Sequence, residues 1–205
     1  MKHLVIGITG GVGSGKSTVL KILSEIFGAR LLRADDIANE MLAPGGPTWR
    51  FYKDRLGDAV IKEDGTLDRA AVARQLYADP DFVQEVNAFV HPRVKDRIRR
   101  RIARSRQPLV LVESALMKEG SLADLCDEIW YVTAPHEVRT ARLMADRGYP
   151  RERCEQIMDL QRSDDEYAAL ADRVIDNSGT PEQVRGTVCR LAAEILKEEG
   201  IPACT

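Results

Sequence analysis

The sequence predicts an α/β fold in which a parallel sheet is flanked by helices and interrupted by a helical insertion. Short apolar segments alternate with helical patterns along most of the 205 residues. Strands that alternate with helices form parallel sheets, because each connecting helix crosses a face of the sheet. A glycine-rich loop follows the first apolar segment, and one long stretch lacks strand patterns. The candidate strands are 4–8, 30–32, 109–112, 129–133 and 174–176.

The first strand leads into the segment from Gly10 to Ser17, which reads GGVGSGKS and fits the phosphate-binding P-loop pattern G-x-x-x-x-G-K-[ST]. Glycines let the backbone bend so that several N–H groups point into one concavity, and the N-terminus of the following helix adds its positive dipole end. Lys16 can reach the β- and γ-phosphates, and the Ser17 hydroxyl can hold Mg²⁺. The motif predicts a P-loop NTPase-type sheet that binds a nucleoside triphosphate. The candidate contacts are Gly11, Gly13, Ser14, Gly15, Lys16, Ser17 and Thr18.

Helical patterns fill the rest of the chain between the strands. The helix after the P-loop is expected to end at Gly28, because glycine is common just beyond helix ends. From 35 to 106 the helical patterns are 35–42, 67–77, 81–90 and the residues from 92 onward, separated by the turn-forming segments 44–47, 64–65, 79–80 and 91–92. An insertion there is expected above the carboxyl ends of the strands, where ligands bind, so we interpret it as the wall for a second substrate. A last helix, 182–198, is expected to pack on the sheet.

Asp35 directly follows the second strand and is the candidate general base. A carboxylate there can accept a proton from an acceptor hydroxyl during phosphoryl transfer. The alternative is that Asp35 caps the helix at 35–42, the commonest task of aspartate in such a place. Asp36 is expected to cap that helix or to face solvent.

Glu113 ends the apolar run of the third strand and is a candidate metal partner. A carboxylate at that strand end can orient Mg²⁺ or its water. The alternative is that Glu113 bonds only to the backbone or to Lys16. Glu119 is a further candidate nearby.

Arginines cluster after the fourth strand, and Arg142 is the preferred candidate for closing over the phosphates. A planar guanidinium can bind phosphate oxygens through two parallel hydrogen bonds and neutralise transition-state charge. The alternative for each of these arginines is a solvated helix face. The other members of the cluster are Arg147, Arg151 and Arg153.

A second basic region, Arg93–Arg106, holds eight basic residues and one acid, Asp96. Apolar residues recur within it at helical spacing, so it is expected to form an amphipathic helix. Its basic face can dock a multiply phosphorylated substrate or can simply face solvent. His91, at the expected start of this helix, can bond a substrate phosphate or be structural.

Asn177 lies in the loop that follows the last strand, within the segment Asp176–Gly179. A loop at the carboxyl end of a strand near the P-loop can recognise adenine through amide groups, so Asn177 is a candidate ATP contact. The alternative is a plain Asn/Gly turn.

Composition and charge argue against several classes of protein. A formal net charge of −2 with 5% aromatic residues disfavours nucleic-acid binding. No apolar run approaches the roughly 20 residues of a membrane span, and no signal-peptide pattern opens the chain. The four cysteines lack C-x-x-C spacing, which favours reduced thiols over a zinc site. These features predict a cytoplasmic protein, and they do not set its oligomeric state.

Several further segments resemble the dephospho-CoA kinase family. They are 7–18, 34–38, 44–45, 64–69 (DGTLDR), 91–92 (HP) and 171–179 (ADRVIDNSG), in matching order over about residues 3–195. The resemblance implies ATP- and Mg²⁺-dependent phosphorylation of the ribose 3′-hydroxyl of dephospho-CoA, giving CoA, the last step of CoA synthesis. It also implies a P-loop core at about 1–34, 107–134 and 171–205, a helical CoA-binding insertion at about 35–106 and a small helical lid at about 135–170.

The resemblance also assigns roles to individual residues. Asp35 matches the catalytic base, Arg142 matches an arginine of the lid, and Arg69 and His91 match positions in the substrate domain. With Glu113, these make the expected acceptor side of the site. Two other functions stay open: a kinase for another small acceptor such as a nucleoside or nucleotide, and a non-catalytic ATP-binding switch that contacts a protein or RNA through 93–106.

The chain departs from the family pattern in the acceptor and lid regions. Arg33 replaces the first aspartate of D-A-D, and 113–119 reads ESALMKE where the family has D-x-P-L-L-F-E. The second arginine of the lid pattern R-x-x-x-R-D is shifted by one residue, to Arg147. Tyr167 replaces the lysine of Q-x-x-x-x-x-K, and Arg162 or Arg173 is expected to compensate for it.

Overall fold

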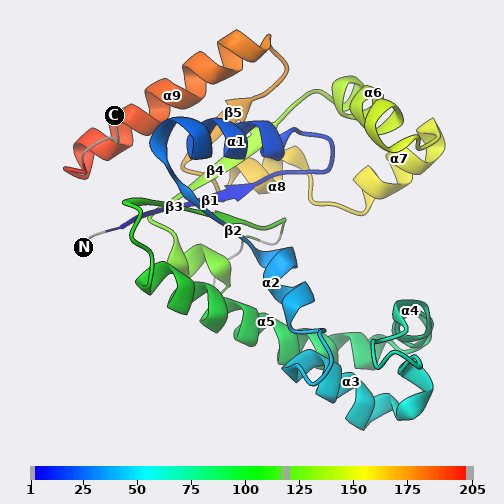
Figure 1. Cartoon of the computed structure of the whole chain (residues 1–205). Coiled ribbons are helices and arrows are strands. Elements are labelled where there is room, and N and C mark those ends of the chain that lie inside the picture. The colour runs from blue at the N-terminus through cyan, green and yellow to red at the C-terminus, as the bar shows by residue number, and fades with distance from the viewer. Residues whose placement is uncertain (1–2, 116, 118–120, 202–205) are drawn as a thin grey trace. The chain divides into compact units, whose positions relative to one another are not determined.

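The computed structural model describes residues 3–115, 117 and 121–201. Its residues divide into two compact units (Figure 1). The first unit combines the chain up to Leu32 with the chain from Ile102 onward, and the second unit is the continuous segment Arg33–Arg101.

The first unit is built on a five-stranded sheet with the strand order β2-β3-β1-β4-β5. The strands are β1 (Leu4–Thr9), β2 (Arg30–Arg33), β3 (Leu109–Glu113), β4 (Glu128–Thr133) and β5 (Arg173–Asp176). β1 pairs in parallel with β3 and β4, and β4 pairs in parallel with β5. All six residues of β1 are buried, as expected for a central strand covered on both faces.

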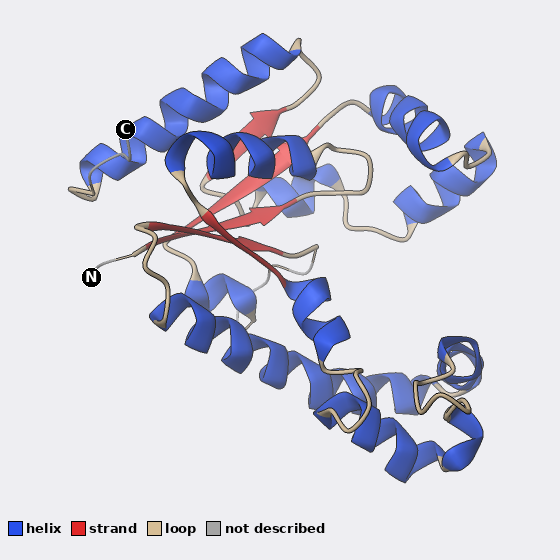
Figure 2. Ribbon diagram, in the orientation of Figure 1, coloured by secondary structure: helices blue, strands red, loops and turns tan. Residues whose placement is uncertain are grey.

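Helices flank this sheet (Figure 2). They are α1 (Lys16–Phe27), α6 (His136–Arg147), α7 (Arg151–Asp159), α8 (Asp164–Ala168) and α9 (Pro181–Glu198), with a 3₁₀ turn, η2, at Leu122–Leu125. The main core joins apolar residues of α1 and α9 to the strands, with Leu23, Trp130 and Val188 fully buried in it. The left-handed Gly28 (φ 60°) ends α1 as predicted.

The second unit is helical. Its elements are α2 (Ala34–Glu40), α3 (Pro47–Leu56), η1 (Asp58–Val60), α4 (Arg69–Ala78) and α5 (Pro80–Ala103), whose last two residues belong to the first unit. Within 34–101, all of which the structure describes, extended pairing is limited to a single bridge between Ile61 and Leu67. A core of Tyr52, Phe82 and neighbouring apolar residues holds the unit together, and the rings of Phe51 and Phe89 stack at 4.3 Å.

The predicted parallel sheet, its flanking helices and the helical character of the insertion are confirmed, with two corrections in the second unit. Helix α3 was not expected, because the segment 44–47 suggested a helix stop. Pro47 instead opens α3 at its first turn, where proline needs no hydrogen-bond partner for its nitrogen. The break at His91-Pro92 was also wrong, because α5 runs through Pro92. Buried residues on both sides of it, such as Val86 and Val94, hold the helix together despite the backbone bond that proline removes.

No helix in the described part of the chain has the length and hydropathy that crossing a membrane requires.

Candidate active site

The carboxyl ends of the parallel strands bring the candidate residues of the first unit to one edge of the sheet. Ile8 lies opposite Glu113, Thr9 lies opposite Tyr131, and Thr133 lies opposite Asp176. The P-loop leaves β1 at this edge and leads into α1. In open α/β sheets this is the edge where ligands bind.

The P-loop glycines are required by both the backbone angles and the packing. Gly10, Gly13 and Gly15 have φ values of 147°, 74° and 86°, which side chains rarely adopt. A Cβ on Gly10 would lie 2.3 Å from the Val132 carbonyl oxygen. A Cβ on Gly15 would lie 1.9 Å from Nδ2 of Asn177. The loop therefore packs directly on the ends of β4 and β5.

The first turn of α1 presents a phosphate-binding arrangement. The N–H groups of a first helical turn have no intrahelical acceptors, so they can bind an anion. The Nζ of Lys16 lies over the loop and donates to the carbonyl oxygens of Gly10 (2.7 Å) and Gly11 (3.1 Å). Ser17 and Thr18 are exposed on this turn, whereas the Ser14 side chain is buried. Ser14 can thus serve a nucleotide only through its backbone.

Arg142 and Asn177 lie against the P-loop backbone. Nη1 of Arg142 is 3.4 Å from the Gly13 carbonyl oxygen and 3.3 Å from that of Ser14, and its Nη2 donates to the Asn177 carbonyl at 2.7 Å. Nδ2 of the buried Asn177 donates to the Ser14 carbonyl at 2.8 Å. Both side chains therefore hold the loop in place. Phosphate closure by Arg142 and adenine recognition by Asn177 stay predictions.

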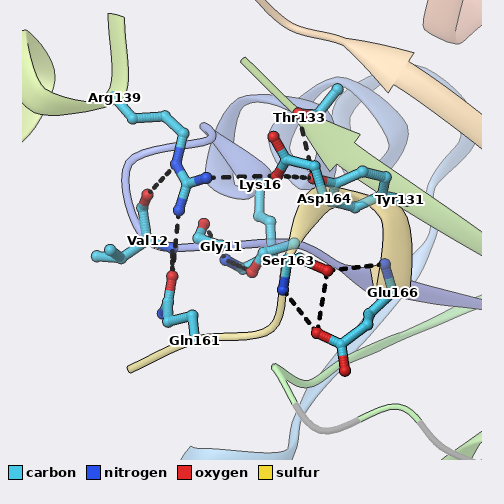
Figure 3. A network of polar contacts seen from close by, with 11 residues as sticks. Gly11, Val12, Lys16, Tyr131, Thr133, Arg139, Gln161, Ser163, Asp164 and Glu166 are labelled. Atoms are coloured by element: carbon cyan, nitrogen blue, oxygen red, sulfur yellow. Dashed lines mark hydrogen bonds and ion pairs between the residues drawn. The ribbon is translucent and has the colours of Figure 1, made fainter. Parts of the chain in front are cut away.

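Arg139 was missed by the sequence reasoning. It lies on α6, is 8% exposed, and its Nε donates to the Val12 carbonyl oxygen at 2.9 Å (Figure 3). Gln161 also reaches the loop, because its Oε1 accepts the Val12 N–H at 2.9 Å. The sequence offers one signal for Arg139: it lies three residues before Arg142, and residues at this spacing share a helix face.

Glu113 is half-buried at the end of β3, next to the strand that feeds the P-loop. Glu119 lies outside the described residues. Among the residues that are described, no three His, Cys, Asp or Glu side chains gather into a metal site of their own. The assignment of Mg²⁺ to the Ser17 hydroxyl and Glu113 stays a prediction.

The two arginines expected to compensate for the lost lysine have hydrogen-bond partners outside the P-loop. Arg173 is the first residue of β5, at the amino end of the strands. It binds Glu128 through both Nε (2.8 Å) and Nη2 (3.0 Å). Nη1 of Arg162 donates to the Met117 carbonyl at 2.7 Å. The expectation for Arg173 was wrong, because an arginine at the first residue of a strand faces the amino edge, away from the loops that bind ligands.

In the second unit, Asp35 is exposed near the start of α2. The N-cap of α2 is Arg33, which makes no side-chain cap bond, so the capping interpretation of Asp35 is wrong. Asp35 and Asn39 are four residues apart and share a helix face. Oδ1 of Asn39 accepts a hydrogen bond from Nη2 of Arg69 at 3.3 Å. Asp35 and Arg69 thus lie on one side of α2.

A cavity of about 450 Å³ adjoins this side of α2 within the second unit. Its walls come from α2, the following turn, the segment before α4, with Lys62 and Asp68, and the start of α4, with Arg69. Asp68 caps α4 by accepting from the N–H groups of Ala70 (2.9 Å) and Ala71 (3.0 Å). The motif DGTLDR therefore builds a turn and a helix cap that fix Arg69 at the cavity wall.

His91 and the basic region lie on α5. His91 is exposed in the middle of this helix, so its expected place at a helix start was wrong. Several basic side chains of the region have local partners. Arg93 stacks 3.5 Å from the centre of the Phe89 ring, Arg100 binds Asp96 at 2.7 Å, and Arg101 binds Glu40. The buried Val94 and Ile98 confirm the amphipathic pattern.

Comparison with known proteins identifies the family of the chain. The sequence model of the dephospho-CoA kinase family matches residues 4–183. The chain belongs to this family. The dephospho-CoA kinase of Thermobifida fusca is 36% identical over 195 residues, which are 95% of this chain and 97% of that protein. The dephospho-CoA kinase of Escherichia coli K12 is 34% identical, covering 94% of this chain and 93% of its own length.

Solved structures show the same fold. The Thermus thermophilus protein TT1252 is 31% identical and superimposes with a TM-score of 0.80, covering 95% of this chain and 98% of its own. A dephospho-CoA kinase from Campylobacter jejuni, at 19% identity, and a shikimate kinase from Acinetobacter baumannii, at 16%, share the fold with TM-scores of 0.69 and 0.53. They cover 95% and 96% of this chain, and 98% and 94% of their own chains. The predicted P-loop kinase fold and the kinase class of the chain are thereby confirmed.

Proposed function

We propose that this protein transfers the γ-phosphate of ATP to the ribose 3′-hydroxyl of dephospho-CoA, giving CoA and ADP as the last step of CoA synthesis. The observation that carries the proposal is that the family match spans both the P-loop and the helical unit. This span supports the presence of both a donor part and an acceptor part in the chain.

In the donor part, the P-loop holds the triphosphate. Backbone N–H groups of the loop and of the first turn of α1 bind the phosphate oxygens, and Lys16 moves from the loop carbonyls to the β- and γ-phosphates. Mg²⁺, when bound, neutralises phosphate charge, and the Ser17 hydroxyl and Glu113 are the residues that hold it. Arg142 orders the loop and closes over the γ-phosphate.

In the acceptor part, Asp35 accepts the proton of the 3′-hydroxyl while the hydroxyl oxygen forms its bond to the γ-phosphorus. The bond from that phosphorus to the bridging oxygen breaks, and ADP leaves with the electron pair. The placement of Asp35 and Arg69 on one side of α2, with Arg69 and Asn39 in the cavity wall, supports this assignment. Arg69 and His91 contact the substrate, and Arg69 suits a phosphate group because its guanidinium donates in a planar fork.

We propose that three parts of the chain have different roles. Residues 1–34, 107–134 and 171–205 form the P-loop core, 35–106 bind the acceptor, and 135–170, with α6, α7 and α8, act as the lid. The separate helical unit Arg33–Arg101 supports the acceptor segment. We further propose a cytoplasmic location, where thiols such as those of Cys126, Cys154 and Cys189 stay reduced.

An acceptor panel tests the proposal. The purified protein is incubated with Mg·ATP and dephospho-CoA, adenosine, AMP, shikimate or gluconate, and phosphorylated products are measured by mass spectrometry. We expect kcat/KM for dephospho-CoA to exceed the others by at least about 10²-fold, because a site built around specific polar contacts rejects substrates that lack them. Turnover of another acceptor with none of dephospho-CoA would make the protein a different small-molecule kinase. Salt-sensitive RNA binding without any transfer would make it an ATP-binding switch.

A further inference from the structure

A buried arginine beside the P-loop has no place in the function proposed so far. Arg139 lies on α6, and its side chain is 9% exposed. Burying an arginine is costly unless its charge and its donors are satisfied. Its partners therefore indicate what the charge is for.

Two of these partners hold one residue of the loop. Nε of Arg139 donates to the Val12 carbonyl oxygen at 2.9 Å, and its Nη2 lies 3.2 Å from Oε1 of Gln161 (Figure 3). The same Oε1 accepts the Val12 N–H at 2.9 Å. Arg139 and Gln161 thus bond both backbone polar groups of Val12, a residue between two P-loop glycines. The adjoining peptides cannot rotate without breaking one of these bonds.

The glycines on either side leave room for this contact. A Cβ on Gly11 would lie 2.2 Å from Nη2 of Arg139, and a Cβ on Gly13 would lie 2.8 Å from the Arg139 carbonyl oxygen. The guanidinium therefore fills the space that a side chain at position 11 would need. It also keeps the Val12 carbonyl turned toward α6, so that this partial negative charge does not face the bound phosphates.

The third partner of Arg139 is the carboxylate of Asp164, on α8. Nη1 of Arg139 is 3.5 Å from Oδ1 of Asp164, and the same oxygen accepts a hydrogen bond from the Tyr131 hydroxyl. Tyr131 stacks on Tyr167 with ring centres 5.1 Å apart. Tyr167 occupies the position of the lysine in the family pattern. The positive charge next to Asp164 is that of Arg139, on α6.

We propose that Arg139 is a positioning residue for the ATP site, which acts through Val12 and with Gln161 to hold the P-loop in its phosphate-binding conformation. The proposal rests on the kinase function but not on the acceptor. The side-chain contacts of Arg139 are to Val12, Gln161 and Asp164, so it acts on the site through the loop. Its loss acts on nucleotide affinity first.

The test compares Arg139→Met and Arg139→Lys with the wild type, using Arg190→Met as the matched control. Arg190 is an exposed arginine on α9 that binds only Glu194, four residues away, among the contacts described here. The Kd of Mg·ATP is measured without acceptor, and KM and kcat are measured with dephospho-CoA. Thermal unfolding reports whether each variant folds.

We expect Arg139→Met to raise the Kd and KM of ATP by about 10- to 100-fold, the loss that a buried charged hydrogen-bond set predicts. The KM of the acceptor should change by less than about 2-fold. Lysine keeps a donor for the Val12 carbonyl, so Arg139→Lys should recover part of the affinity. Gln161→Ala should act in the same direction, and the double variant should be less than additive because both residues hold Val12.

Two results would overturn the proposal. One is a lowered melting temperature with an unchanged Kd for ATP, which would make Arg139 merely structural. The other is an effect confined to the KM of the acceptor. If Arg139→Met does not fold, Gln161→Ala serves in its place, because it removes the acceptor of the Val12 N–H and leaves the ion pair between Arg139 and Asp164 intact. A several-fold rise in the Kd of ATP is then expected, and no rise would contradict the proposal. If the wild type fails to phosphorylate dephospho-CoA but Arg139→Met still weakens ATP binding, the proposed acceptor falls and this proposal stands.

Discussion

Replacing Gly15 by alanine should damage both the stability of the fold and nucleotide binding. Gly15 has φ of 86°, and an added Cβ would lie 1.9 Å from Nδ2 of Asn177. The left-handed conformation costs an L residue about 1–2 kcal/mol. Moving the Asn177 amide also breaks its buried bond to the Ser14 carbonyl, which costs about 1–3 kcal/mol. Together the free energy of unfolding should fall by about 2–5 kcal/mol.

Gly28→Ala separates these two contributions. Gly28 also has a left-handed φ, 60°, but an added Cβ there would meet nothing within 4 Å. It should therefore lose only the conformational part, about 1–2 kcal/mol, and should keep wild-type affinity for ATP. Gly15→Ala should weaken ATP binding by more than about 10-fold, because the loop that it distorts supplies the phosphate contacts. Urea unfolding followed by circular dichroism and equilibrium binding of Mg·ATP measure both effects. Equal losses of stability in the two variants, with unchanged ATP affinity in Gly15→Ala, would refute the packing argument.

Two further predictions concern Asn177, at the same edge of the sheet, and Cys126, which directly follows η2. Asn177→Ala should lower the free energy of unfolding by about 1–3 kcal/mol and weaken ATP binding, because it leaves the Ser14 carbonyl with only the longer contact to Nη1 of Arg142; urea unfolding and ATP titration check this, and an unchanged ATP affinity would contradict it. Burial raises the pKa of the Cys126 thiol to about 12, so its reactive thiolate stays scarce at pH 9, and thiol labelling of the native protein at this position should become appreciable only as the pH approaches 12. Labelling at pH 7–10 followed by peptide mapping measures this, with the protein in guanidinium chloride as the control that labels fully. Rapid native labelling of Cys126 at pH 8 would contradict the burial argument.

Most of the sheet could be predicted from the sequence because its signals are local. Short apolar runs bounded by turn residues placed each strand correctly to within one residue at either end. The P-loop motif gave the position of the nucleotide site, because its glycines are tied to one strand–loop–helix geometry. The helix at Pro47–Leu56 and the unbroken course of α5 through Pro92 were not predictable in this way. Both depend on packing within the helical unit, which overrides the local tendency of proline to end a helix.

The site was predictable in its residue types but not in its contacts. Arg142 and Asn177 were selected as ligands of ATP, and the structure instead shows what each does to the loop backbone. Arg139 carries no motif of its own. Its significance comes from Val12, which is 127 residues away in the sequence, and only the folded chain brings the two together.

In the proposed kinase reaction, the P-loop holds ATP while the carboxylate of Asp35 takes the proton of the acceptor hydroxyl. Asp35→Asn tests it most directly, with Asp36→Asn as the control, because Asp36 is the exposed neighbour on the same helix. With dephospho-CoA as acceptor, Asp35→Asn should lower kcat by about 10²–10⁴-fold, the usual contribution of a general base, and leave the Kd of Mg·ATP nearly unchanged. Asp36→Asn should stay close to wild type. An Asp35→Asn variant that makes CoA as fast as Asp36→Asn would contradict the account.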